Sequence, residues 1–211
     1  MSKGLIAMLL VAATASGTVG SPQEVVQRAV TRVVQLVDAS GSASPTDTGV
    51  RGAIAAARRR AEIRSLADDL FDFEEVSRRA LSVHWAARTP AERTEFVTLF
   101  TDLLERAYLG KIESYTGEKI VYTGEKVDGD YAIVRSQVVP RKRARSVTLE
   151  YRLWKRDGQW KVYDLLVDGV SFVSTYRSQF DRIIQSSSYA ALMDRMRDHR
   201  PETRMGTSER P

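Results

Sequence analysis

The sequence predicts one α+β domain, in which a curved antiparallel sheet of about four strands packs against N-terminal and C-terminal helices. Apolar residues recur every three or four positions from residue 22 to residue 115, as expected for helices. From residue 118 to residue 167 the apolar period falls to two, as in strands with one buried face. Helical spacing returns after Gly169. Helices on both sides of a run of strands are typical of the α+β class.

The first 20 residues differ from the rest of the chain. Lys3 is their only charged residue, and their apolar run of about eleven residues is too short to cross a bilayer. This pattern predicts a secretory signal peptide over residues 1–20, cleaved after Ala15 or after Gly20, with an uncleaved anchor as the alternative. The remainder is expected to form one domain over residues 21–198, followed by a disordered tail over residues 199–211.

The cysteine content and the net charge restrict the expected cellular location and partners of the protein. The chain has no cysteine among its 211 residues, so it has neither a disulfide bond nor a lipid-modified cysteine. An exported domain of this size can fold without disulfide bonds, and the expected location is the periplasm.

The formal net charge is +5, with basic runs at residues 58–60 and 141–145. Nucleic acid is not an expected partner. The basic runs could contact anionic lipid headgroups, contact an acidic docking surface, or simply be solvated surface.

The predicted helices in the first half are amphipathic. The first covers about residues 21–37 with its valines on one face, and a loop is expected over residues 38–49. An Ala- and Arg-rich helix follows over about residues 50–69, and Asp72 is expected to cap the short helix after it.

A long helix is expected to begin at Thr89-Pro90-Ala91-Glu92. This segment combines a capping hydroxyl, a proline at the first helical position and a capping-box glutamate. Gly110 is expected to break the helix near its end.

Strands are expected at about residues 118–126, 130–140, 146–156 and 159–167. Asp128-Gly129 and Asp157-Gly158 predict hairpin turns. Asp168-Gly169 separates the last strand from helices expected at about residues 170–186 and 189–197.

Groups that could perform catalysis are scarce. The only histidines are His84 and His199, so a histidine-based nucleophile pair or a multi-histidine metal site is not expected. No glycine-rich phosphate loop and no Gly-x-Ser-x-Gly motif is present. Carboxylate pairs exist, such as Asp164 with Asp168, but turn and strand roles explain them better than acid–base chemistry. No metal and no cofactor is expected.

Several segments together resemble the MlaC family of periplasmic phospholipid carriers, also known from toluene-tolerance systems. The most specific are Asp168-Gly169-Val170-Ser171 and Tyr176-Arg177-Ser178-Gln179-Phe180. The similarity covers about residues 22–197, and the other matching segments are residues 71–81, Trp85, 89–96, Phe100, 103–104, 108–115, 151–152, 160–164 and 187–189.

The resemblance implies a curved sheet and helices that enclose a deep apolar cavity for lipid acyl chains. It implies no catalysis. Its partners would be an outer-membrane lipoprotein complex and the lipid-binding subunit of an inner-membrane ABC transporter, which a monomeric carrier visits in turn. Tyr163, Thr175 and the Arg-rich hairpin differ from the residues typical of the family. These differences leave open a hopanoid (polycyclic triterpenoid) as cargo instead of phospholipid.

Sixteen aromatic and aliphatic positions on both layers are expected to face inward as lipid-binding candidates, about half of them in contact with lipid and the others in ordinary core. They are Phe73, Val76, Phe96, Phe100, Leu104, Tyr108, Val134, Val138, Leu149, Tyr151, Leu153, Val162, Val167, Val170, Phe172 and Tyr176. Arg177 is expected to pair with a buried carboxylate such as Asp164 rather than with a lipid phosphate.

Two other classes of function are also compatible with the sequence. One is a small-molecule enzyme on a similar open-cone fold, which the shortage of histidine disfavours. The other is a structural or docking protein with a filled core. Apolar periodicity alone does not distinguish a filled core from a cavity.

Overall fold

A computed structural model describes residues 20–41, 49–141 and 145–198. The expected signal peptide, apart from Gly20, and the expected tail lie outside these ranges.

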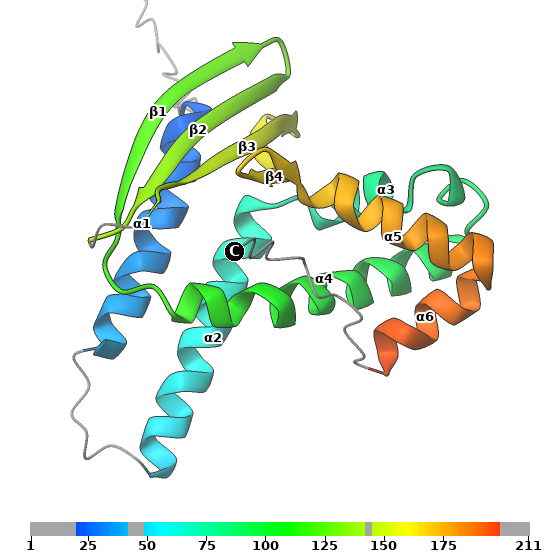
Figure 1. The fold of residues 1–211 in the computed structure, drawn as a ribbon, viewed down its shortest axis with the longest axis horizontal. Helices are drawn as coiled ribbons and strands as arrows, with labels where there is room; N and C mark the ends of the chain where they lie inside the picture. Colours follow the sequence, from blue (N-terminus) through cyan, green and yellow to red (C-terminus); the bar gives the residue numbers. More distant parts are fainter. Residues whose placement is uncertain (1–19, 42–48, 142–144, 199–211) are drawn as a thin grey trace, which may run out of the picture.

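The chain has the predicted α+β architecture, in which helices that precede and follow the strands in the sequence pack with one antiparallel sheet (Figure 1). The helices are α1 (Pro22–Gly41), α2 (Val50–Leu70), α3 (Phe73–Leu81), the 3-10 turn η1 (Ser82–His84), α4 (Pro90–Glu113), α5 (Phe172–Ser186) and α6 (Tyr189–Arg197). The strands are β1 (Lys119–Asp128), β2 (Tyr131–Val139), β3 (Val147–Arg156), β4 (Gln159–Val167) and β5 (Val170–Ser171). The order β1-β2-β3-β4-β5 makes the sheet a simple meander, with one short strand more than the four expected.

One of the two predicted hairpin turns lies at its aspartate–glycine pair, and the other is shifted by one residue. Asp157 and Gly158 both have positive φ, 50° and 78°, as a two-residue primed turn requires. In the first hairpin Asp128 still pairs with Tyr131, so the turn is Gly129-Asp130, one residue later than predicted. Gly129 supplies the positive φ there.

The residues after β4 differ from the expectation of a helix beginning at Val170. Asp168 and Gly169 have φ values of 48° and 82° and form another tight turn. Val170 and Ser171 then pair back on β4 as the edge strand β5. Helix α5 starts only at Phe172, where the Ser171 hydroxyl accepts a hydrogen bond from the Ser174 amide.

A β-bulge in β4 changes which side chains face inward. Leu153 of β3 is opposite Val162, but Arg152 is opposite Asp164, so Tyr163 is an extra residue on β4. Beyond the bulge Leu165, not Asp164, lies on the same face as Val162.

Helix starts were well predicted and helix ends less so. The Thr89 capping box is present in full, and Asp72 caps α3 through the Glu75 amide at 3.0 Å. Helix α1 continues to Gly41, four residues past its predicted end. Helix α4 continues through Gly110 to Glu113, so the predicted break is wrong; a single glycine weakens a helix by only about 1 kcal/mol.

Buried apolar side chains form two separate cores. In the first, α3, α4, α5 and α6 pack around Phe96, Phe100 and Phe180, with both phenylalanines of α4 edge-to-face against Phe180. In the second, α1 packs on the inner face of the sheet, where Val26 and Leu153 are fully buried. Figure 1 shows α2 and α4 crossing beneath the sheet, between the regions of these two cores.

Candidate functional site

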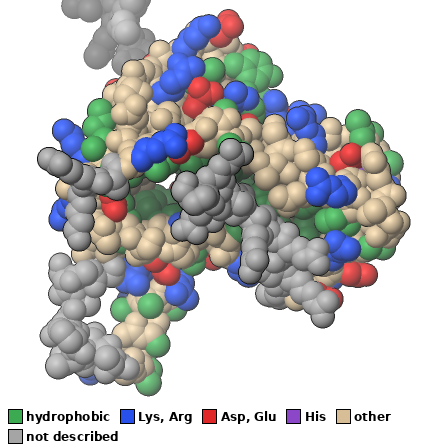
Figure 2. Space-filling model, viewed as in Figure 1, with side chains coloured by type: hydrophobic (Ala, Val, Ile, Leu, Met, Phe, Trp, Pro, Cys, Tyr) green, Lys and Arg blue, Asp and Glu red, His purple; other side chains and the backbone are tan. Residues whose placement is uncertain are grey.

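The most prominent feature of the described residues is a cavity of about 690 Å³. Its walls come from α1, α2, α3, α4, the start of α5 and the inner face of the sheet. Residues of both cores contribute, such as Phe100 and Tyr176 from the helical core and Leu70 and Tyr151 from the sheet core. The cavity is therefore the space where the two cores do not meet. Figure 2 shows a hollow lined with hydrophobic side chains between the sheet and α4.

The structure brings eleven of the sixteen predicted residues together in this wall. They are Phe73, Val76, Phe100, Leu104, Tyr108, Val138, Leu149, Tyr151, Val167, Phe172 and Tyr176. They come from α3, α4, three strands and α5, so residues up to about 100 positions apart in the sequence meet around one space.

The other five predicted residues lie elsewhere. Val134, Leu153 and Val162 face inward as expected, but they are fully buried in the solid core where α1 covers the sheet. Phe96 is fully buried among the helices, between Trp85, Phe100 and Phe180.

Val170 is placed on the outside, with 59% of its surface exposed. Its predicted inward position assumed a helix from residue 170, whereas it belongs to the edge strand β5. None of these five residues is therefore part of the cavity wall.

The sixteen predicted residues include none from the cavity walls made by α1 and α2. Their apolar lining residues are Ala29, Val30, Val33, Val34, Val37, Ile63, Leu66, Ala67 and Leu70. The only signal in α1 was its stripe of valines, which fits a packed helix face as well as a cavity wall. Val33 and Val34 are only half-buried because they border the cavity instead of a neighbouring helix.

Aromatic rings stiffen one wall. Tyr108 of α4 and Phe172 of α5 stack with ring centroids 4.6 Å apart, and both line the cavity. Burial raises the pKa of Tyr108, and burial raises the pKa of Tyr151 on the sheet to about 12. Both phenols are therefore neutral at physiological pH, and the wall carries no charge there.

Arg60, Arg64 and Glu105 border the cavity, form ion pairs and remain partly in water. Arg60 of α2 contacts Glu113 of α4 at 2.9 Å, and the same helices are joined by Arg64 with Asp102 and Glu105 at 2.9 and 2.8 Å. The arginine side chains stay about half exposed, so these pairs form a rim and not part of the interior. The hydrogen bond from Arg60 lowers the pKa of Glu113, which stays ionised.

Asp164 borders the cavity but has structural partners. Its carboxylate, only 6% exposed, accepts hydrogen bonds from the Ser171 hydroxyl at 2.7 Å and the Val173 amide at 3.1 Å. Arg152 lies 3.9 Å away, and Arg177 is exposed on α5. The predicted Arg177–Asp164 pair is wrong, because the bulge turns Asp164 toward the start of α5.

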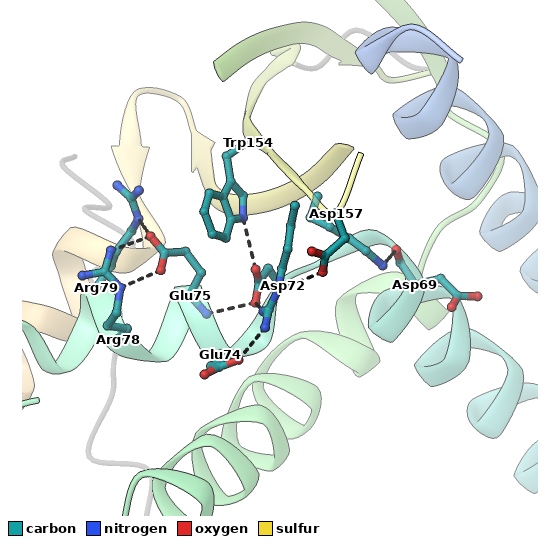
Figure 3. A network of polar contacts seen from close by, with 10 residues as sticks. Asp69, Asp72, Glu74, Glu75, Arg78, Arg79, Trp154 and Asp157 are labelled. Carbon is teal, nitrogen blue, oxygen red and sulfur yellow. Dashed lines mark hydrogen bonds and ion pairs between the residues drawn. The ribbon is translucent and has the colours of Figure 1, made fainter. Parts of the chain in front are cut away.

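A polar network fixes α3, which carries the lining residues Phe73 and Val76, to the sheet (Figure 3). The buried Asp72 carboxylate accepts hydrogen bonds from Trp154 Nε1 at 3.1 Å and from Arg156 at 2.8 Å, besides the Glu75 amide. The hydrogen bonds that Arg156 donates to Glu74 and Asp72 raise the pKa of its guanidinium group.

Glu75, on the next turn, is held by two arginines of its own helix. Arg78 donates two hydrogen bonds of 2.6 Å to its carboxylate, and Arg79 donates one of 2.7 Å (Figure 3). Burial raises the pKa of Glu75, but the bonds from Arg78 and Arg79 more than offset this and the net pKa is lowered. The network is a structural anchor and does not open into the apolar cavity.

Chemically reactive groups are not gathered at the cavity. His84 pairs with Asp181 at 2.8 Å, and neither residue lines it. Within residues 20–41, 49–141 and 145–198, no group of three or more His, Asp or Glu side chains could hold a metal ion. The arrangement can enclose an apolar molecule, and its charged rim can remain in water.

None of the helices in the described ranges is both long enough and apolar enough to span a bilayer. Fold and site together define an α+β protein whose sheet and helices enclose an apolar cavity with a charged rim. Residues 50–198 match the model of a protein family described as MlaC protein. Since the match covers more than half of the 211 residues, the chain belongs to the MlaC family, as its sequence motifs predicted.

Two relatives illustrate the similarity. The intermembrane phospholipid transport system binding protein MlaC of Haemophilus influenzae is 22% identical over 129 residues, 59% of this chain and 60% of the relative. The match thus spans less than two thirds of that relative's length. The phospholipid-binding protein from Ralstonia solanacearum, solved with a phospholipid bound, is 23% identical with a TM-score of 0.67. That match covers 85% of this chain and 96% of the other, and it establishes the fold.

Proposed function

We propose that this chain is a periplasmic lipid carrier that holds the acyl chains of a phospholipid in its cavity. The observation that carries the proposal is the cavity itself, about 690 Å³ with mostly aliphatic and aromatic walls. Cavities with such walls exclude water and accept apolar molecules. The names of the two relatives, a phospholipid transport protein and a phospholipid-binding protein, support this cargo.

The energetics of hydrocarbon transfer suit a carrier. Each methylene removed from water contributes about 0.8 kcal/mol, so two acyl chains with roughly 30 methylenes gain about 24 kcal/mol. The same chains gain a similar amount inside a bilayer. Exchange between a bilayer and the cavity is then close to balanced, whereas loss of the lipid into water is prohibitive.

The rim explains how one carrier could accept several headgroups. A charged headgroup inside the apolar cavity would lose its hydration without a partner, at a cost of several kcal/mol. The half-exposed pairs of Arg60 and Arg64 mark where the walls meet water. The headgroup would remain at this boundary while the acyl chains fill the interior.

The proposed setting is transport between two membranes. The carrier would exchange lipid with an outer-membrane lipoprotein complex and with the lipid-binding subunit of an inner-membrane ABC transporter. Membership of the MlaC family and the signal-like first 20 residues support this setting. A monomer suits a carrier that must leave each partner.

Native mass spectrometry of the protein purified from cells tests the proposal. We expect an added mass of about 0.7 kDa, the size of a two-chain amphiphile, which chloroform–methanol extraction releases. Fragmentation identifies the cargo, and a polycyclic triterpenoid would assign a hopanoid in place of phospholipid. A bare polypeptide mass, together with no uptake of lipid from vesicles by delipidated protein, would overturn the carrier function.

A further inference from the structure

The outer end of α2, residues 50–58, extends beyond the end of α1 and beyond α4 (Figure 1). Two large apolar side chains are exposed on it, Val50 by 77% and Ile54 by 53%. Figure 2 shows hydrophobic side chains along this projecting part of the molecule. Large apolar side chains that remain solvent-exposed on adjacent helical turns indicate a contact surface.

The outer end of α2 is amphipathic, with an apolar and a cationic stripe. Val50 and Ile54 are four residues apart, so they lie on one side of the helix, with Ala53 and Ala57 between and beside them. Arg51 and Arg58 are seven residues apart and lie together on the adjacent side.

The arginines of the outer end differ from those farther along α2. Arg60 and Arg64 are paired with carboxylates of α4 at the cavity rim. Among the residues that the structure describes, neither Arg51 nor Arg58 has a carboxylate partner, and both are exposed. Two exposed cations beside an apolar stripe are complementary to an anionic surface that has an apolar layer beneath it.

The outer end is also continuous with the cavity. Arg60, two residues after Arg58, is the first residue of α2 that lines it, followed by Ile63 and Arg64. Whatever the outer end contacts is therefore brought next to the cavity rim. The outer end projects from the rest of the described structure, which suits insertion into a soft lipid interface (Figure 1).

We propose that the outer end of α2 docks on the surface of an anionic phospholipid bilayer. Val50 and Ile54 enter the boundary between headgroups and acyl chains, and Arg51 and Arg58 pair with lipid phosphates. Two cations and two aliphatic side chains give a weak, salt-sensitive and reversible contact. This inference goes beyond the proposed function, because it concerns how the protein meets a membrane and not what fills its cavity.

Vesicle flotation with the full-length protein tests the proposal. Vesicles of equal parts phosphatidylglycerol and phosphatidylcholine are compared with phosphatidylcholine alone, at low and at high salt. We expect binding to the anionic vesicles at low salt only. The double variant Arg51→Glu/Arg58→Glu should bind at least about 30-fold more weakly, since each basic residue at the surface contributes roughly a factor of five. Val50→Ser/Ile54→Ser should also weaken binding while leaving the net charge unchanged.

The matched control is Arg177→Glu/Arg182→Glu on α5, which changes the net charge equally at two exposed positions away from α2. It should retain most of the binding. Circular dichroism melts verify that every variant is folded, and native mass spectrometry reads cavity occupancy separately.

Two results would overturn the inference. One is equal loss of binding in the α5 control, which would assign the effect to net charge alone. The other is indifference of the wild-type protein to anionic vesicles; if it then bound poly-glutamate through Arg51 and Arg58, the surface would serve an acidic protein partner instead.

Discussion

Filling the cavity from within the sheet should expel lipid without unfolding the protein, and Val138 is the position for this test. Val138 lies on β2 between its Cα partners Ile120 of β1 and Val147 of β3, and all three line the cavity. A larger side chain at Val138 therefore projects from the centre of a three-strand wall into open space. Val138→Trp is the change we propose.

The magnitude follows from the hydrocarbon that tryptophan displaces. Tryptophan has about seven more heavy atoms than valine, and each methylene it displaces costs the lipid about 0.8 kcal/mol. The upper limit is about 6 kcal/mol, and repositioning of the acyl chains recovers part of it. We expect a loss of about 3–6 kcal/mol, which is roughly 150-fold to 25,000-fold in affinity.

Gln137→Trp is the matched control. Gln137 precedes Val138 on β2, is exposed and points to the opposite face of the sheet. Native mass spectrometry should find lipid on the control and the wild-type protein but little on Val138→Trp. Thermal melts should show all three folded. Wild-type lipid occupancy in a folded Val138→Trp protein would refute the assignment of this face as the cavity wall.

Three further predictions concern stability. Asp72→Ala removes the acceptor of three hydrogen bonds and should lower the free energy of unfolding in urea by about 2–4 kcal/mol; a loss under 1 kcal/mol would contradict an anchoring role. Thr89→Ala should cost about 1 kcal/mol in the same assay, and Thr89→Ser should restore it, because the capping box at the start of α4 needs the hydroxyl. Burial raises the pKa of Tyr151 from 10.0 to about 12, so above pH 10 the folded state binds more protons than the unfolded state. Stability should be complete below pH 10 and fall as the pH rises toward 12, by up to about 1.4 kcal/mol per unit, and Tyr151→Phe should flatten this fall in urea titrations; an unchanged slope would assign the effect to other groups.

Local features were predictable where a few adjacent residues decide the outcome. The Thr89 capping box and the Asp72 cap depend on atoms three residues apart, and both are present. The turn at Asp157-Gly158 follows from two residues that tolerate positive φ. The shift at Gly129 and the extension of α4 through Gly110 arise because pairing and packing over many residues outweigh one local preference.

The site was predictable as a set of inward-facing residues but not as a boundary between cavity and core. Leu149 and Leu153 have the same alternation on β3, yet Leu149 borders the cavity and Leu153 is fully buried under α1. The difference depends on the position of α1 on the sheet. The residues close to Leu153 in the sequence do not determine that position. The valines of α1 appeared as an ordinary helical stripe for the same reason.

By itself the sequence determined the α+β class, the order of the elements, most helix starts and membership of the MlaC family, because these depend on local periodicity, caps, turns and motifs. Only the tertiary structure decided that a hollow separates two cores, that the bulge at Tyr163 turns Asp164 toward α5, and that Val50 and Ile54 at the outer end of α2 are exposed. The physical reason is that a cavity and an exposed helix end are mismatches between distant elements. Such mismatches leave the apolar pattern of each single element unchanged.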